Sequence, residues 1–218
     1  VETSGPSTNS VVVRVTDDGS PPLGAINTYT TVVREVNLPP QINTLSAQTV
    51  DELTQLTVNL SATDPDLPAN LLTFSLVNPP AGAGITPQGV FTWTPTEAQG
   101  PSTNTITVRV TDNGNPALNA TSQFQVVVNE VNSAPAIAAV ANQTVVAPGS
   151  LSLNLSARDG DFPANALTYS LVSGPAGLAV TPAGAVTWTP GDAQTPSTNL
   201  VQVQVTDGGS PGLSSTTS

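Results

Sequence analysis

Carboxylates are the only side chains in this sequence that could serve in number as acids, bases or metal ligands. The 218 residues include 15 Asp and Glu, four Arg, and no His, Cys or Lys, which gives a formal net charge of −11. Without His and Cys, a Ser/His/Asp triad, a thiol nucleophile and a tetrahedral zinc site are excluded. The four arginines are too few and too scattered to follow a phosphate backbone, so no nucleic-acid partner is expected.

The acids gather in short loop motifs and are sparse along the expected strands. Asp64-Pro65-Asp66 and Asp159-Gly160-Asp161 are two such motifs, whereas outward strand positions carry Thr, Ser, Asn and Gln. Carboxylates that converge without a cationic partner either have raised pKa values or bind a cation. Ca2+ fits best, because it accepts roughly six to eight oxygen ligands in irregular geometry. The alternative interpretation is that these aspartates only cap turns through hydrogen bonds or lie solvated in loops.

Paired carboxylates could also act as the acid and base of a glycoside hydrolase. However, a general acid needs an apolar setting that keeps it protonated, and these pairs lie in polar loops among other anions. Both pairs also recur with the repeat described below, which argues against a catalytic role. We therefore expect no enzymatic activity. A carbohydrate-binding or adhesive module stays open as an alternative, because fold alone does not fix function.

The sequence repeats itself with a period of 95 residues and no insertion. Pro6-Ser7-Thr8-Asn9 returns at 101–104 and at 196–199, and Glu35-Val36-Asn37 returns at 130–132. A period of this length suits a whole small domain in tandem better than a solenoid unit. Residues 1–37 are then the C-terminal part of a first repeat, 38–132 a complete repeat, and 133–218 a last repeat without its final strand. No apolar run approaches the roughly 20 residues that span a bilayer.

Each repeat is predicted to consist of short strands with one apolar face. Apolar and polar residues alternate in these segments, and Pro, Gly and Asp mark the turns between them. About seven strands in a repeat of this length predict an all-β fold of tandem seven-stranded Greek-key β-sandwiches. Trp93 and Trp188 alternate with Thr and are expected in the core, not on a sugar-binding surface. The expected strands are 56–62, 72–76, 91–94, 106–110 and 124–128 in the complete repeat, and 151–157, 167–171 and 201–205 in the last repeat.

Several segments of the complete repeat resemble a cadherin repeat. They are residues 61–70 with the strand Leu72-Thr73-Phe74-Ser75, the loop at 108–116, and the linker at 128–135. Residues 89–95 are more typical of the bacterial cadherin-like and immunoglobulin-like repeats of large surface proteins. The resemblance covers the whole chain, and it implies calcium bound at the junctions between successive domains.

The resemblance also implies which residues hold the calcium. All acids except Asp18 and Asp51 stand where the family pattern places a ligand, and Asp17 would face a domain that precedes this chain. At the junction after the complete repeat, the implied ligands are Glu52, Glu97, Glu130, Asn132, Asp159, Asp161, Asn165 and Asp207. At the preceding junction, they are Glu2, Glu35, Asn37, Asp64, Asp66, Asn70 and Asp112.

The sequence departs from the cadherin pattern at the linkers and in the last repeat. Cadherin linkers usually carry a further Asp where this chain has Leu38 and Ser133, so fewer ions per junction are expected than in the family. Ala147 stands in the last repeat where the complete repeat has Glu52. This change is expected to weaken the junction that follows the last repeat.

The expected function is mechanical. Ca2+ held by adjacent repeats and their linker would turn a flexible string of sandwiches into a stiff extracellular stalk, adhesin shaft or filament at a bacterial surface. The absence of Cys and Met suits an exported chain. The expected partners are neighbouring repeats or copies of the same chain, with glycans or other surface proteins as further candidates. The incomplete first and last repeats indicate either a window from a longer chain or copies that complete one another by strand addition.

Overall fold

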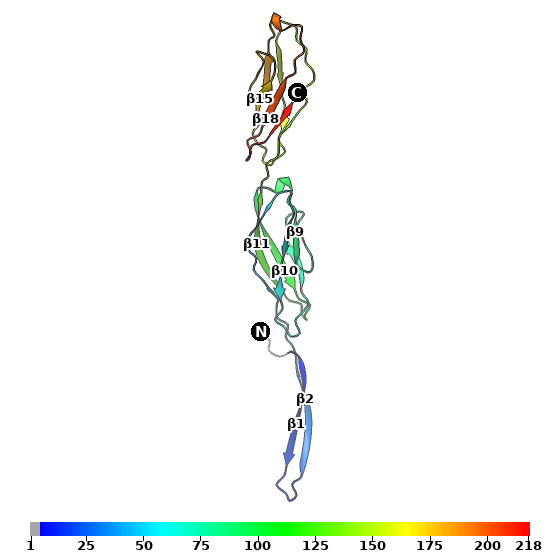
Figure 1. Cartoon of the computed structure of the whole chain (residues 1–218). Helices are drawn as coiled ribbons and strands as arrows, with labels where there is room; N and C mark the ends of the chain where they lie inside the picture. Colours follow the sequence, from blue (N-terminus) through cyan, green and yellow to red (C-terminus); the bar gives the residue numbers. More distant parts are fainter. Residues whose placement is uncertain (1–4) are drawn as a thin grey trace. The chain divides into compact units, whose positions relative to one another are not determined.

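The chain is built almost entirely from β-strands. The computed structural model describes residues 5–218, where the only helices are two short 3-10 turns, η1 (Glu97–Gln99) and η2 (Asp192–Gln194) (Figure 1). The predicted all-β class is therefore confirmed. Over these same residues, no helix has the length and apolar character needed to cross a membrane.

The described residues form two compact units. The first comprises 5–50, 54–95 and 103–127, and the second comprises 51–53, 96–102 and 128–218. The second unit thus contains the linker and the whole last repeat. It also contains two short loop segments of the complete repeat, which carry Glu52 and Glu97.

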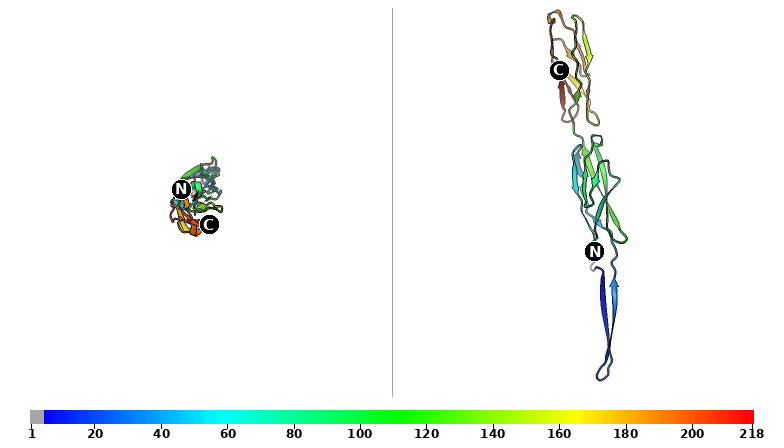
Figure 2. Two further views of the ribbon diagram at one scale, coloured as in Figure 1. Left: turned by 90° about the horizontal axis from the view of Figure 1, so that it is seen from above. Right: turned by 90° about the vertical axis from the view of Figure 1, so that its right-hand side faces the viewer.

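The chain begins with a long antiparallel hairpin of β1 (Ser7–Thr16) and β2 (Gly24–Val33), visible in Figures 1 and 2. Asp17 shapes the loop between them, since its Oδ1 accepts the backbone N–H groups of Gly19 and Leu23 at 3.1 and 2.8 Å. A hairpin of two strands has no second layer of its own to cover its apolar side chains. Accordingly, Val15 is 67% exposed.

The complete repeat folds into three antiparallel sheets. A four-stranded sheet has the order β4-β11-β10-β7, a three-stranded sheet has the order β5-β9-β8, and β3 pairs with β6. The strands are β3 (Gln41–Ile42), β4 (Gln48–Asp51), β5 (Leu56–Asn59), β6 (Ala62–Thr63), β7 (Thr73–Val77), β8 (Gly84–Ile85), β9 (Val90–Trp93), β10 (Ser102–Thr111) and β11 (Asn119–Asn129).

The core of this repeat lies between the two larger sheets. Phe91 on β9 packs against Phe124 on β11, with ring centroids 5.5 Å apart and planes at 89°. Trp93 is buried as predicted, and its indole N–H donates to the carbonyl of Ala81 at 3.1 Å. Alternate residues of β10, among them Val108 and Val110, are also buried. Two apolar sheet faces packed together are the arrangement of a β-sandwich.

One predicted strand is divided in the structure. Residues 56–62 were expected to form a single strand, but β5 ends at Asn59 and β6 begins at Ala62. β5 pairs with β9, whereas β6 pairs with β3, so the chain changes sheet between them. Alternation of apolar and polar residues reports a buried face but not the pairing partner, which explains the error.

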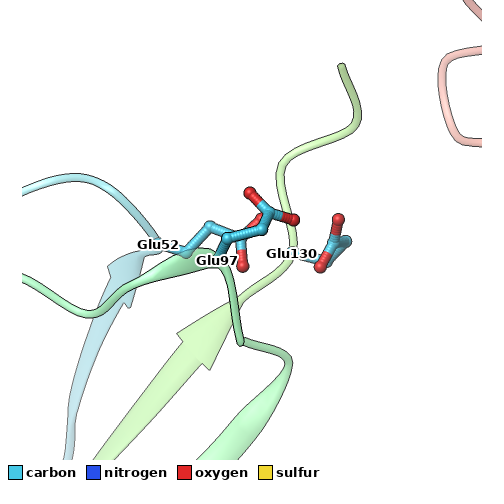
Figure 3. A group of neighbouring side chains, drawn as sticks. All are labelled: Glu52, Glu97 and Glu130. Atoms are coloured by element: carbon cyan, nitrogen blue, oxygen red, sulfur yellow. The ribbon is translucent and has the colours of Figure 1, made fainter. Parts of the chain in front are cut away.

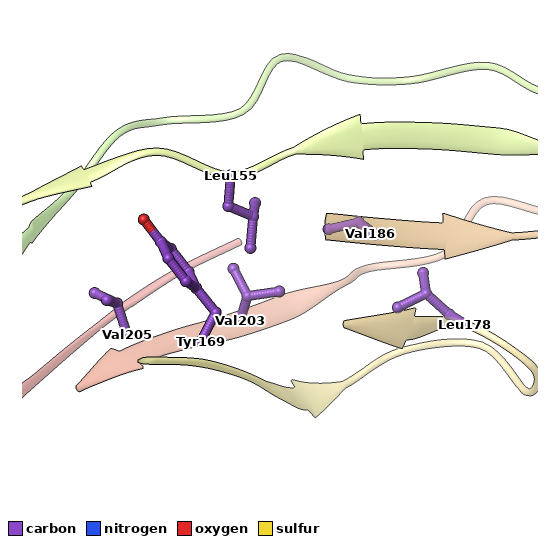
Figure 4. Packing of buried hydrophobic residues seen from close by; sticks show 6 residues of the cluster. All are labelled: Leu155, Tyr169, Leu178, Val186, Val203 and Val205. Atoms are coloured by element: carbon purple, nitrogen blue, oxygen red, sulfur yellow. The ribbon is translucent and has the colours of Figure 1, made fainter. Parts of the chain in front are cut away.

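The last repeat, in the second unit, has a similar arrangement. β15 pairs with β18 and β18 with β19, β13 and β16 both pair with β17, and β12 pairs with β14. The strands are β12 (Ala136–Ile137), β13 (Leu151–Asn154), β14 (Ala157–Arg158), β15 (Thr168–Ser173), β16 (Ala179–Val180), β17 (Ala185–Trp188), β18 (Gln202–Thr206) and β19 (Ser214–Thr217). Figure 4 shows the core, made by Leu155, Tyr169, Leu178, Val186, Val203 and Val205. The predicted strand 151–157 is again divided, here into β13 and β14.

The repeat offers a matched test of the core. Val110 is fully buried, whereas Val15, its counterpart 95 residues earlier, is largely exposed. We expect Val110→Ala to lower the free energy of unfolding by about 2 kcal/mol, because it removes buried methyl groups and leaves a cavity. Val15→Ala should change it by less than about 0.5 kcal/mol. Urea denaturation followed by tryptophan fluorescence measures both, and equal effects of the two variants would contradict the assigned core.

Candidate metal centre

Three glutamates of the second unit bring their carboxylates together. One oxygen each from Glu52, Glu97 and Glu130 lies within 4.8 Å of the other two. Figure 3 shows the three side chains converging from separate segments of the chain. Among residues 5–218, this is the one group of three acids close enough to share an ion.

Local backbone structure positions each member of this glutamate trio. Glu52 lies in the turn after β4, and its N–H donates to the carbonyl of Asn129 at the end of β11 at 3.0 Å. Glu130 follows β11 directly. Glu97 is the first residue of η1, where the N–H of Thr96 donates to Oε1 of Gln99 at 2.9 Å. The Thr-x-x-Gln spacing is a helix-start signal that the sequence already contains.

The trio has fewer hydrogen-bond donors than buried oxygens. Oε1 of Glu52 accepts the N–H of Val131, and Oε1 of Glu97 accepts the N–H of Phe162, both at 3.0 Å. Oε2 of Glu52 and both carboxylate oxygens of Glu130 are buried and have no hydrogen-bond partner in the described part of the chain, and Glu52 as a whole is only 1% exposed. Burying an ionised carboxylate is costly unless it is paired or coordinates a metal. An all-oxygen set of this kind suits Ca2+.

The electrostatics of the trio also favour a bound cation. Burial, followed by the negative charges of Glu52, Glu97 and Asp161, raises the pKa of Glu130 from 4.5 to about 7. Like charges and desolvation both disfavour the ionised form. Near neutral pH, this carboxyl therefore needs either a proton or a cation.

The predicted ligands of the linker and the last repeat form a second cluster. The amide of Asn132 donates to Asp207 at 3.2 Å and accepts from Nδ2 of Asn165 at 2.8 Å. The same Nδ2 donates to Asp161 at 2.9 Å. The N–H of Ser133 also donates to Asp161, at 3.0 and 3.2 Å to its two oxygens. We call these five residues the Asn132 network.

An equivalent network lies in the first unit, 95 residues earlier. Asn37 donates to both oxygens of Asp112 at 3.2 Å and accepts from Asn70 at 2.8 Å. Asp66 accepts from Asn70 at 2.8 Å, and from the N–H of Leu38 at 3.1 and 3.2 Å. The sequence placed these residues together as ligands, and the structure brings them together through hydrogen bonds.

Asp112 and Asp207 also organise their own loops. In each, Oδ1 accepts two backbone N–H groups, at 2.9 and 3.0 Å for Asp112 and both at 3.0 Å for Asp207. Burial acts to raise the pKa of both carboxyls, but these hydrogen bonds and those from the linker amides outweigh it and lower the pKa. The turn-capping alternative is thus correct for Oδ1. It does not account for Oδ2 of Asp207, which is buried without a partner.

The two Asp-x-Asp motifs divide their oxygens in the same way. Oδ1 of Asp64 accepts the N–H groups of Asp66 and Asn70 at 3.1 and 2.9 Å. Oδ1 of Asp159 makes the equivalent contacts with Asp161 and Asn165 at 3.2 and 3.0 Å. Oδ2 of both Asp64 and Asp159 is buried and accepts no hydrogen bond from residues 5–218. Each first aspartate thus holds its loop with one oxygen and leaves the other for a different partner.

Glu35 and Glu2 are the remaining predicted ligands of the preceding junction. Glu35 lies two residues before Asn37 and has a buried carboxylate oxygen. Glu2 lies outside the described residues.

Sequence reasoning missed three groups that complete the site. Ser133 was noted only for lacking a carboxylate, yet both its N–H and its hydroxyl donate to Asp161. The backbone N–H groups of Val131 and Phe162 bind the glutamate trio. Residue types do not reveal backbone donors, whereas the hydroxyl of Ser133, directly after the predicted ligand Asn132, is a signal that the sequence contains.

Comparison with known proteins concerns the fold of the chain. Residues 37–129 match the family model described as "Bacterial Ig domain". These residues form a bacterial immunoglobulin-like domain. A search of curated proteins gives no match for the chain.

Solved structures with a similar fold include cadherin ectodomains. The crystal structure of the protocadherin gamma-B4 extracellular domain aligns at 23% identity and a TM-score of 0.51, covering 96% of this chain and 39% of that one. Domains EC22-24 of mouse cadherin-23 align at 24% identity and a TM-score of 0.54, covering 95% and 72%. Extracellular domains 1-5 of protocadherin gamma-B2 align at 18% identity and a TM-score of 0.58, covering 96% of this chain and 44% of that one. The chain thus spans less than half the length of the two protocadherin chains, and these comparisons show a cadherin-like fold.

The raised pKa of Glu130 predicts how metal-free protein responds to pH. Because the folded state holds this proton more tightly than the unfolded state, stability should fall as pH rises from about 4.5 to about 7. The lowered pKa values of Asp112 and Asp207 affect stability in a lower pH range, since the stability that these residues contribute is lost only as pH falls below about 4. Melting temperatures of wild type and Glu130→Gln in calcium-free buffer measure this. The variant should lose the slope between pH 5 and 7, and an identical slope in both would contradict the assignment.

The Asn132 network should be a measurable source of stability. Asn132→Ala removes an amide that serves both Asp207 and Asn165, and leaves their polar atoms unsatisfied. We expect a loss of about 1–3 kcal/mol in the free energy of unfolding. Asn142→Ala, at an exposed position of the same unit, is the control. Urea denaturation compares the two, and an Asn132 variant as stable as the control would show that the network contributes nothing.

Proposed function

We propose that the glutamate trio binds Ca2+ and that this binding stiffens an extracellular stalk, adhesin shaft or filament. The observation that carries the proposal is the set of buried carboxylate oxygens without donors on Glu52 and Glu130. With Glu97, they offer at least three anionic oxygens inside a space that one cation can fill. Bound calcium would supply the positive charge that these side chains lack.

The donor set favours calcium over other common cations. Zinc prefers His and Cys ligands, and the sequence contains neither. Magnesium demands near-ideal octahedral geometry and keeps several waters, whereas calcium accepts an irregular set of carboxylates and carbonyls. Asp159, with its unpartnered Oδ2, and Asp161, whose charge acts on Glu130, are the further ligands that we propose for this junction.

The mechanical role follows from where the ligands lie in the sequence. Glu52 and Glu97 belong to the complete repeat, Glu130 to the linker, and Asp159 to the last repeat, when the chain is divided at 37 and 132. An ion shared by these segments fixes their mutual geometry only while it is bound. Binding to the ordered state alone adds RT ln(1 + [L]/Kd), about 2.7 kcal/mol at 100 times Kd. We propose a structural role without catalysis, and partners that are neighbouring repeats or further copies of the chain.

The remaining predicted ligands belong to this proposal as a second class. Asn132, Asn165 and Asp207 in the second unit, and Asn37, Asp64, Asp66, Asn70 and Asp112 in the first, hold the loops in place around the linkers. We propose that Asp64 and Asp207 use their unpartnered Oδ2 atoms toward a cation. Glu2 and Glu35 would complete the junction before the complete repeat.

Calorimetry and thermal melts test the proposal. We expect wild type to bind Ca2+ and its melting temperature to rise with calcium and fall with a chelator. Glu97→Gln should weaken binding by about tenfold or more, because it removes one anionic ligand without changing the size of the side chain. Asp18→Asn is the control, since Asp18 is an exposed acid outside the ligand positions of the family pattern. A wild-type melting temperature that changes with neither calcium nor chelator would overturn the proposed function.

A further inference from the structure

We propose that Gly100 is a positioning residue for the metal centre, because the absence of a side chain there leaves the space that the Glu52 carboxylate occupies. This inference rests on the proposed calcium site and names the residue that decides which repeats can build one. Gly100 is not itself a ligand. It follows η1 directly, and its N–H donates to the carbonyl of Glu97 at 3.4 Å.

The geometry at Gly100 leaves no room for a side chain beside Glu52. A Cβ built on Gly100 would overlap Oε2 of Glu52 and would lie 3.1 Å from its Cδ and 3.3 Å from its Cβ. The overlapped oxygen is the one that has no hydrogen-bond partner. Since Glu52 is almost completely buried, its carboxylate could give way only by leaving the trio.

The effect of a side chain at Gly100 should be confined to the site. The backbone at Gly100 has φ −102° and ψ 158°, a region that every residue type adopts without strain. The atom in the way is the end of a flexible side chain and not backbone. Alanine should therefore leave the sandwich folded while it moves one ligand.

The last repeat shows what accompanies the loss of this glutamate. Ala147 stands in place of Glu52, and Thr195 stands in place of Gly100. Where the acid is absent, a β-branched residue stands at the position that is glycine in the repeat with the acid. Gly100 has a counterpart in the first repeat as well, Gly5.

The turn after Glu52 changes together with these two positions. Leu53 has φ 58°, a left-handed conformation that is uncommon for a residue other than glycine. Its counterpart in the last repeat is Pro148, whose ring fixes φ near −65° and excludes that turn. Three linked differences thus separate a repeat that presents a buried glutamate from one that does not.

Gly100→Ala tests the inference, with Gly84→Ala as its control. Gly84 lies in β8 of the same repeat, and a Cβ there meets nothing within 4 Å. By calorimetry, we expect Gly100→Ala to bind Ca2+ at least tenfold more weakly than wild type and Gly84→Ala to bind equally well. In calcium-free buffer, exchange of the Val131 amide should also become faster in Gly100→Ala only, because that amide donates to the displaced Glu52 carboxylate.

A double variant shows whether the effect passes through Glu52. In a Glu52→Ala background, Gly100→Ala should cause no further loss of affinity, because the side chain it displaces is already gone. A full additional loss in that background would overturn the proposal. So would a Gly100→Ala protein with wild-type affinity and wild-type exchange at Val131. If wild type binds no calcium at all, the proposed function fails. The exchange rate of the Val131 amide in Gly100→Ala then decides by itself whether Gly100 positions Glu52.

Discussion

Negative charge buried without a counter-charge is the constraint on which this structure depends. The protein has four cationic side chains in all. Within residues 5–218, both oxygens of Glu130 and one buried oxygen each of Glu52, Asp64, Asp159 and Asp207 find no hydrogen-bond donor. An ionised carboxylate in such a place must be neutralised by protonation or by a cation. These five acids are not a solubilising surface, because each of them has a buried carboxylate oxygen.

The chain satisfies its carboxylates in two physically different ways. Around Asn132 and Asn37, side-chain amides and backbone N–H groups supply donors, so Asp161 and Asp66 are held by hydrogen bonds. Neither carboxylate oxygen of Glu130 has a donor among residues 5–218, and the pKa of this carboxyl is raised. Hydrogen bonds fix a linker whether or not an ion is present, whereas we propose that the glutamate trio responds to one. This division would give each junction a permanent part and a calcium-dependent part.

Much of the fold could be read from alternating residues. The apolar positions of β10 and β11 identify the buried face correctly, because a strand with one face in a core must alternate. The same signal fails where the chain changes sheet between β5 and β6. It also fails at Val15, since the pattern of the hairpin equals that of β10 although no second layer covers it. Periodicity records which face is apolar, and only neighbouring chain segments decide whether that face is covered.

The sequence by itself determined the class of fold, the repeat of 95 residues, and the residue types at the junctions, because each is a property of pattern and composition. It also brought Glu52, Glu97 and Glu130 into one candidate set through resemblance. Only the tertiary structure decided which members of that set converge and which oxygens remain without donors. Those facts depend on backbone N–H groups such as those of Val131 and Phe162, and on the space beside Gly100. Residue types do not identify a backbone donor or an empty volume, so the effect of either on a carboxylate appears only when folding brings distant segments together.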